Sequence, residues 1–182
     1  MQEKVIIAGA GGQGIMLLGK ILVEAAADDG REITWLPSYG AEVRGGTAYC
    51  MAVISDREIG SPFVDKADTL IIMNEPSLER FKSRIKNRGL LFVNSSLVEA
   101  GVENKNVRIF KLPFTEVALK LGNIKVANTV ALGSYIAATK HIAPHTVIAA
   151  MERMAPQDKK NLIEINQRAL CAGMELVKNA KG

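Results

Sequence analysis

The chain has 182 residues, of which 48% are hydrophobic and 23% are charged, and its formal net charge is +4. This length and composition exclude a disordered chain and predict one folded domain over residues 1–182. Five basic residues at alternate positions have few aromatic residues among them, which favours a solvated helix face over a nucleic-acid-binding surface. They are Arg80, Lys82, Arg84, Lys86 and Arg88.

The cysteines and histidines do not form a metal-binding pattern. Cys50 and Cys171 lie far apart, and neither belongs to a C-x-x-C pair of the kind that binds zinc or an iron–sulfur cluster. His141 and His145 have a zinc-compatible spacing, but Pro144 between them predicts a helix junction instead. The chain shows neither a signal-peptide pattern nor a membrane-spanning run, so we expect a cytoplasmic protein without a membrane partner.

The first third of the chain predicts a strand, a glycine-rich turn, a helix and two further strands. Residues 4–8 are a short apolar run that ends in glycine, which is typical of a buried parallel strand. Apolar residues recur at helical spacing over residues 13–29, and Gly30 is placed to end that helix. Residues 32–36 and 47–56 both predict strands. The loop between them is too short for a crossover helix, so we expect an antiparallel pair and a mixed sheet.

The rest of the chain alternates strands and helices and then becomes helical. Further strands are predicted at residues 68–73, 89–93 and 107–111. Helices are predicted at residues 76–87, 114–121, 126–139, 144–154 and 158–178. In the last helix, apolar pairs recur every seven residues and predict a seam that packs on the sheet or on a partner. The pattern predicts an α/β fold, a three-layer α/β/α sandwich that is Rossmann-like with a mixed sheet.

The segment IIAGAGGQGIMLLGK places Gly9-x-Gly11-x-x-Gly14 between the first strand and the first helix. Glycines at such a turn let the backbone bend sharply and let a phosphate approach the N–H groups of the helix start. A dinucleotide site also needs an acidic residue at the end of the second strand, and here that strand ends in WLPS. The turn is thus a plain connection, an anion site or, with least support, an NAD or FAD site.

The loop after the second strand reads PSYGAEVRGGT and is expected beside the glycine turn. Open α/β sheets bind ligands at this end of their strands. The loop carries a phenol, a carboxylate and a guanidinium, those of Tyr39, Glu42 and Arg44, which favours contact with a ligand or partner. The alternative is an internal ion pair between Glu42 and Arg44 that stabilises the connection.

Three polar residues follow later strands of the predicted sheet. Asn74, Glu75 and Asn94 either lie on the same rim as the glycine turn or cap the segments that follow them. Ser38, Ser95 and Ser96 have no evident histidine and aspartate partners, and no nucleophile-elbow motif is present. The sequence therefore predicts no catalytic residue in this chain.

Together, GAGGQG and PSYGAEVRGGTAYC resemble the gamma subunit of the 2-oxoacid:ferredoxin oxidoreductases, which is equivalent to one domain of the fused pyruvate:ferredoxin enzymes. The similarity extends to DTLIIMNEPSLERF and NIKVANTVALGSYIAA and spans nearly the whole chain. Pyruvate-type gamma subunits tend to read FGPERRGAP at the second motif, whereas 2-oxoglutarate and branched-chain types read SYGxExRGGT. Residues 38–47 follow the second form, so the resemblance favours 2-oxoglutarate as the substrate.

The resemblance implies a cytoplasmic hetero-oligomer that converts a 2-oxoacid, coenzyme A and oxidised ferredoxin to acyl-CoA, CO2 and reduced ferredoxin. The complex would use thiamine diphosphate for decarboxylation and iron–sulfur clusters for electron transfer. Both cofactors are implied for other subunits, namely alpha, beta and, where present, delta. This chain alone would bind none of them firmly, and it would be inactive by itself.

We predict that the glycine turn and the following loop form one rim that faces the catalytic subunits and helps to hold coenzyme A. The predicted cofactor-binding residues are Gly9, Gly11, Gly12, Gln13, Gly14, Ser38, Tyr39, Gly40, Glu42, Arg44, Gly45, Gly46 and Thr47. Arg44 ranks above Glu42, because a guanidinium pairs with a phosphate or with a carboxylate of a partner. The alternatives are a stand-alone NAD(P)-dependent oxidoreductase and a purely structural subunit.

Overall fold

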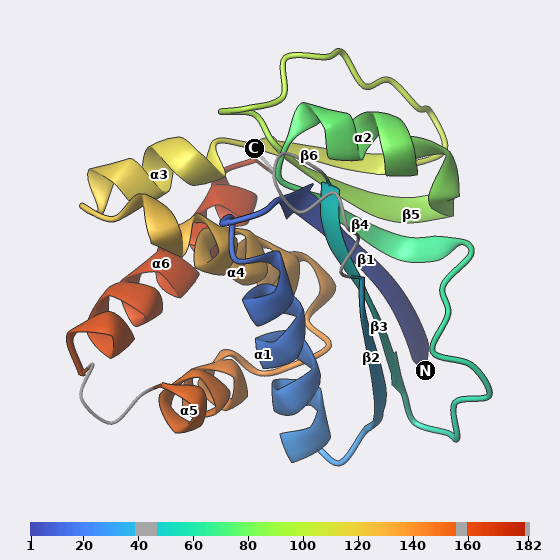
Figure 1. The fold of residues 1–182 in the computed structure, drawn as a ribbon, viewed down its shortest axis with the longest axis horizontal. Coiled ribbons are helices and arrows are strands. Elements are labelled where there is room, and N and C mark those ends of the chain that lie inside the picture. Colours follow the sequence, from blue (N-terminus) through green and yellow to red (C-terminus); the bar gives the residue numbers. More distant parts are fainter. Residues whose placement is uncertain (39–46, 156–159, 181–182) are drawn as a thin grey trace.

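A six-stranded mixed sheet forms the centre of the computed structural model, which describes residues 1–38, 47–155 and 160–180. The strand order is β2-β3-β1-β4-β5-β6 (Figure 1). The strands are β1 Gln2–Ala10, β2 Glu32–Ser38, β3 Thr47–Ser55, β4 Ala67–Ile72, β5 Ile85–Asn94 and β6 Arg108–Leu112. Strands β1, β4, β5 and β6 are parallel, whereas β3 runs antiparallel between β1 and β2. The predicted mixed sheet is therefore confirmed.

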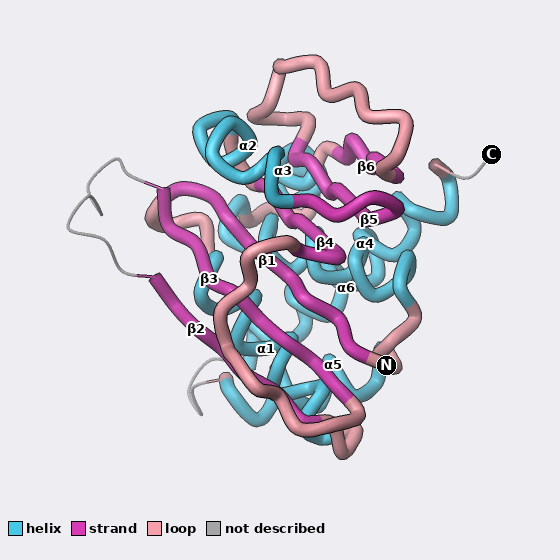
Figure 2. The backbone as a smooth tube through the Cα atoms, turned by 90° about the vertical axis from the view of Figure 1, so that its right-hand side faces the viewer, coloured by secondary structure: helices cyan, strands magenta, loops and turns pink. Residues whose placement is uncertain are grey.

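Helices cover both faces of the sheet, unequally. The α-helices are α1 Ile15–Asp28, α2 Glu75–Phe81, α3 Phe114–Lys120, α4 Ala127–Thr139, α5 Pro144–Met154 and α6 Lys160–Asn179, with short 3-10 helices η1 Lys82–Arg84 and η2 Ile124–Val126. Helices α1 and α4 lie on one face, α5 and α6 lie outside them, and α2 lies on the other face (Figure 1, Figure 2). The α/β fold is confirmed. Within the described ranges, none of these helices is long and apolar enough to cross a membrane.

Alternate residues of β1 separate the two apolar cores. Val5 and Ile7 face the larger core with α1, α4, α5 and α6, whereas Ile6 and Ala8 face the smaller core beneath α2. All four are fully buried. A strand buried on both sides reads as a continuous apolar run, which is why β1 was recognisable in the sequence.

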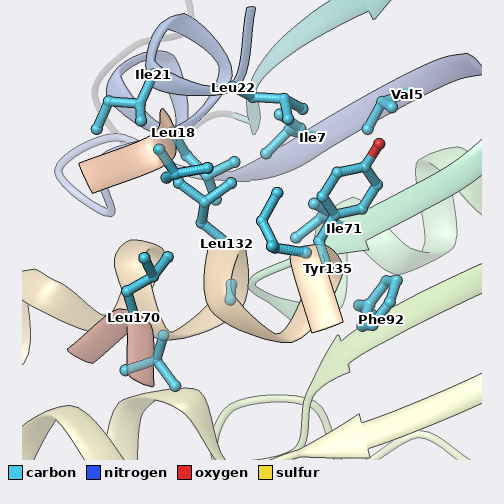
Figure 3. Packing of buried hydrophobic residues seen from close by; sticks show 14 of the residues in the cluster. Val5, Ile7, Leu18, Ile21, Leu22, Ile71, Phe92, Leu132, Tyr135 and Leu170 are labelled. Atoms are coloured by element: carbon cyan, nitrogen blue, oxygen red, sulfur yellow. The ribbon is translucent and has the colours of Figure 1, made fainter. Parts of the chain in front are cut away.

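Helix α4 is enclosed between the sheet and α6. Its residues from Ala127 to Ile136 are all buried, and Tyr135 points back toward β1 (Figure 3). A Cβ atom at Gly133 would lie 2.1 Å from the carbonyl oxygen of Leu170, and one at Gly173 would lie 2.0 Å from that of Val130. The apolar seam of α6 therefore packs on α4 at close range and not on the sheet.

The helix predicted over residues 76–87 is too long. Helix α2 ends at Phe81, and β5 begins at Ile85, opposite Ala67 of β4. The basic residues consequently do not share one helix face. Arg84 donates to the carbonyl oxygen of Asp65 at 2.8 Å, and Lys86 pairs with Asp68 at 2.6 Å. These contacts fasten the start of β5 to the entry of β4.

The other predicted elements lie within a few residues of the observed ones. Gly30 has a φ of 75° and follows the last turn of α1, where its N–H donates to the carbonyl oxygen of Ala27, as a C-terminal glycine does. Pro144 begins α5, which places His141 in the connection after α4 and His145 in the first turn of α5. The predicted helix junction is thus confirmed.

Candidate functional site

The carboxyl edge is the edge of the sheet at which β1, β4, β5 and β6 end. Because β3 is antiparallel to β1, it begins at this edge, with Thr47 opposite Ala10 and Ala48 opposite Gly9. Strand β2 ends here as well, with Ser38 opposite Tyr49 of β3. The structure therefore brings the glycine turn and both ends of the predicted binding loop to one edge.

The predicted site residues fall into two groups. Those placed at the carboxyl edge are Gly9, Gly11, Gly12, Gln13, Gly14, Ser38 and Thr47. Those outside the described residues are Tyr39, Gly40, Glu42, Arg44, Gly45 and Gly46. The loop side chains that were expected to contact a ligand are thus outside the described residues. The backbone N–H groups of the glycine turn are within them.

Gln13 closes the glycine turn by hydrogen bonds to Ala10. Its side-chain oxygen accepts a hydrogen bond from the Ala10 N–H at 2.7 Å, and its backbone N–H donates to the Ala10 carbonyl at 3.2 Å. A Cβ atom at Gly9 would lie 2.6 Å from that side-chain oxygen and 2.9 Å from the Cβ of Met73. Internal packing therefore explains the glycine at position 9, and the Gln13 side chain is occupied within the turn.

Helix α4 supports the other end of the turn. Gly14 has a φ of 72° and precedes α1, and its carbonyl oxygen accepts from the side-chain nitrogen of Asn128 at 3.1 Å. The Asn128 oxygen accepts from the Thr129 N–H at 2.9 Å, and the Thr129 hydroxyl donates to Asn166 of α6 at 2.7 Å. Sequence reasoning missed Asn128. The available signal was an amide side chain in the mostly apolar helix start ANTVALG.

A second amide extends this framework along the edge. The carbonyl oxygen of Met73 accepts from both Gln13 and Asn94, each at 3.3 Å. Asn94 is fully buried, and its side-chain oxygen also accepts a hydrogen bond from the Thr115 N–H at 3.3 Å. It thereby caps α3, where the Pro113 side chain offers no acceptor. Of the predicted capping roles, Asn74 does cap α2 by accepting from the Ser77 N–H, whereas Asn94 caps a distant helix instead of the adjacent turn.

The start of α1 is an electropositive feature of this edge. The first N–H groups of a helix have no partners within it, and the aligned peptide dipoles add partial positive charge there. Gly14 supplies no side-chain cap, and the first turn of α1 contains no acidic residue. Leu17 in this turn is 50% exposed. The arrangement suits an anion held by backbone N–H groups beside an apolar contact.

The described residues offer little redox or nucleophilic chemistry at this edge. Cys50 lies under α1, and burial raises the pKa of its thiol to about 12, so it stays protonated and is a poor metal ligand. No group of three histidine, cysteine or acidic side chains suited to a metal ion occurs among residues 1–38, 47–155 and 160–180. What the described part of this edge offers is the backbone N–H groups at the start of α1 and the exposed side chain of Leu17.

A known protein family matches nearly the whole chain. The family model for pyruvate ferredoxin/flavodoxin oxidoreductase matches residues 4–176. The ketoisovalerate oxidoreductase subunit VorA of Methanothermobacter thermautotrophicus is 37% identical over 96% of the chain, which spans only 36% of that relative. The 2-oxoglutarate synthase subunit KorC of Methanocaldococcus jannaschii is 34% identical, and the match covers 92% of both chains.

Two solved structures share the fold. The gamma subunit of a keto/oxoacid ferredoxin oxidoreductase from Geobacter sulfurreducens is 28% identical, with a TM-score of 0.84 and coverage of 97% of this chain and 99% of that one. A 2-oxoglutarate:ferredoxin oxidoreductase from Magnetococcus marinus, solved with 2-oxoglutarate, coenzyme A and succinyl-CoA bound, has a TM-score of 0.89 at 22% identity. This chain covers 31% of the Magnetococcus chain and 98% of its own length.

Proposed function

Since the chain belongs to the pyruvate ferredoxin/flavodoxin oxidoreductase family, we propose that it is the gamma subunit of a 2-oxoacid:ferredoxin oxidoreductase complex. The observation that carries the proposal is the end-to-end match with separate subunits. The KorC relative and the Geobacter gamma subunit are both covered over more than nine tenths of their lengths. In the VorA relative the same region is little more than a third of the chain, which supports a modular unit that other proteins carry in fusion.

In the proposed complex, thiamine diphosphate and the iron–sulfur clusters lie in other subunits, and ferredoxin accepts the electrons. This chain contributes its carboxyl edge, which faces those subunits. The uncapped start of α1 would hold a phosphate of coenzyme A through backbone N–H groups. Arg44, in the neighbouring loop outside the described residues, would pair with a second phosphate or with a carboxylate of a partner. The Magnetococcus relative, which was solved with coenzyme A, supports this choice of ligand.

For the substrate we propose 2-oxoglutarate first and the branched-chain 2-ketoisovalerate second. The loop sequence SYGAEVRGGT supports both, and so do the relatives, which include both a KorC and a VorA subunit. Reconstituted complex assayed with each acid and with pyruvate would decide, because the ratio of kcat/KM values measures preference directly. Highest kcat/KM with pyruvate would contradict the proposal.

The test of the assembly is purification of a tagged chain from its source cells. The proposed function predicts that larger subunits containing thiamine diphosphate and iron–sulfur clusters co-purify with it. Recovery of the chain as a lone, active NAD(P)-dependent enzyme would support the alternative. That alternative has weak support, because β2 ends at Ser38 without the carboxylate that binds an adenosine ribose.

The variant Arg44→Ala tests whether the loop after β2 contacts coenzyme A or a partner subunit. We expect the variant chain to fold as the wild type does, because the change removes only one side chain. In reconstituted complex, the variant should either impair assembly or raise the coenzyme A concentration needed for half-maximal rate. The expected rise is about tenfold, because one charge-assisted contact is lost. The matched control is Arg57→Ala on the exposed segment after β3. Unchanged assembly and unchanged kinetics would remove Arg44 from the site.

A further inference from the structure

A polar cavity lies at the amino edge, the edge of the sheet at which β1 and β4 begin. Its volume is about 370 Å³. The walls come from the starts of β1 and β4, from residues 87–90 of β5, and from the end of α4 with the segment after it, which are far apart in sequence. At about 3.3 Å per residue, the stretch of β1 from Glu3 to Gly9 separates this cavity from the glycine turn by roughly 20 Å. The carboxyl edge therefore does not account for it.

Glu3 presents an unsatisfied carboxyl oxygen to this cavity. Its side chain is only 9% exposed, and one oxygen accepts from the Thr69 hydroxyl at 2.7 Å. The other oxygen makes no hydrogen bond to any residue that the structure describes, and it lies 3.8 Å from Nδ1 of His141. Nδ1 of His141 is itself buried without a partner in the same part of the chain. An oxygen of a largely buried side chain and a buried ring nitrogen thus lie near each other, but too far apart for a direct hydrogen bond.

The spacing of these two atoms suits a shared donor. Burial, followed by the nearby Arg31, lowers the pKa of His141, so its ring is neutral near pH 7 and Nδ1 is an acceptor when Nε2 carries the proton. A nitrogen with several N–H bonds can donate to both acceptors at once. Asp68 does not compete for this donor, because Lys86 and the backbone N–H of Lys4 already occupy its two oxygens. The pair therefore matches an ammonium group.

Arg88 supplies the opposite charge on the same cavity. Its backbone N–H donates to the carbonyl oxygen of Asn106, but its guanidinium has no hydrogen-bond or ion-pair partner among the described residues. Its φ of 64° is in the left-handed region that most residues avoid. Leu90 and Ala138 add apolar surface to the lining. The cavity lining thus combines an exposed guanidinium, unpaired within the described ranges, with the acceptor atoms of Glu3 and His141.

We propose that this cavity binds a small zwitterion of the α-amino acid class, with its ammonium between Glu3 and His141 and its carboxylate on Arg88. The cavity volume exceeds that of a medium-sized amino acid and leaves room for a short side chain. A 2-oxoacid has a carboxylate but no N–H donor, so it leaves Glu3 and His141 unsatisfied. The proposal is independent of the function of the carboxyl edge.

The binding test is calorimetric titration of the full chain with glycine, L-alanine, L-valine and L-glutamate, above the pKa of Glu3. We expect saturable binding of at least one of them. For L-valine, the analogues isobutylamine and isovalerate, which lack the carboxylate and the amine, should each bind at least about tenfold more weakly. Failure of all four amino acids to bind, or an analogue that binds as tightly as L-valine, would overturn the proposal.

Two variants distinguish a loss of ligand binding from a loss of folding. Glu3→Gln keeps the acceptor for Thr69 but removes the charge, and it should weaken binding by at least about tenfold. Arg88→Gly removes the guanidinium and suits the left-handed backbone, so binding should be lost while the melting temperature does not fall. Glu58→Gln, an exposed change away from the cavity, is the matched control. Binding that survives both Glu3→Gln and Arg88→Gly would refute the assignment.

Discussion

Gly9 must be glycine because of the side chains around it. The Gln13 oxygen and the Met73 Cβ occupy the space that a Cβ atom would need. We expect Gly9→Ala to lower the free energy of unfolding by about 2 kcal/mol, since overpacking of a tight site has this magnitude. Chemical denaturation measures the change. Gly60→Ala, where no atom lies within 4 Å of the added carbon, should leave stability within about 0.5 kcal/mol of the wild type. Equal effects of the two substitutions would contradict the packing described.

Glu3 makes stability depend on pH. Burial, partly offset by the hydrogen bond from Thr69, raises the pKa of its carboxyl from 4.5 to about 7. Asp68 on β4 and Lys86 on β5 also act on it, and Tyr135 on α4 and His141 after α4 are further titratable groups that face it. The folded state binds the proton more tightly than the unfolded state. The resulting stabilisation is complete below pH 4.5 and is lost as the pH rises through 7.

The expected loss is about 3 kcal/mol of unfolding free energy between these pH values, relative to Glu3→Gln. Denaturation curves of both proteins across this range measure it. The variant corrects for all other titrating groups, because they are common to both chains. A wild-type protein that becomes more stable than the variant as the pH rises would contradict the buried carboxyl.

The two buried amides show what the sequence could not reveal. Asn94 and Asn128 are indistinguishable by type from surface residues, yet each satisfies backbone groups of an element remote in sequence. Their partners are set by how β5 meets α3 and how α4 meets α1. The glycine turn itself was predictable because its residues are consecutive. Its supports required knowledge of the packed structure.

At the level of elements, α4 and α6 pack with their backbones in close approach at Gly133 and Gly173. Because Gly133 faces the Leu170 backbone, which cannot rotate away, Gly133→Ala must push the helices apart. We expect a loss of about 3 kcal/mol in unfolding free energy. Gly101→Ala, with open space around the added carbon, is the control. Thermal or chemical unfolding that fails to distinguish the two would show that α6 is not seated as described.

Helix and strand periods explain which elements the sequence predicted well. Continuous apolar runs marked β1, β4 and β5, because strands buried on both faces need them. The error over residues 82–88 arose because basic residues at every second position were assigned to a helix. Spacing by two is the period of a strand, and Lys86 and Arg88 do lie on β5. The partner of the α6 seam was not predictable, since spacing shows that a face is apolar but not what covers it.

For the whole molecule, the exposed Leu17 beside the start of α1 tests the docking role of the carboxyl edge. Leu17→Glu should leave the stability of the isolated chain nearly unchanged, because half of the side chain is already exposed. In the proposed complex the same charge would be buried against a partner, so the yield of assembled complex should fall by at least about tenfold. Analytical size-exclusion chromatography of the reconstituted subunits measures it.

Phe63→Glu provides the matched control for this experiment. Phe63 is also about half exposed, but it lies on the segment between β3 and β4, away from the carboxyl edge. We expect complex with this variant to assemble normally. Equal assembly of the Leu17 and Phe63 variants would show that the start of α1 does not meet a partner.

The place of β3 in the sheet has a consequence for nucleotide recognition. In doubly wound dinucleotide-binding sheets the second strand lies directly beside the first, so a carboxylate at its tip can reach the sugar of a nucleotide seated on the glycine turn. Here β3 separates the two, and at about 4.8 Å per strand the tip of β2 is displaced to roughly 10 Å from β1. An acidic side chain at Ser38 would therefore be too remote to bind that sugar. The single strand between β1 and β2 thus removes the geometry on which such enzymes depend.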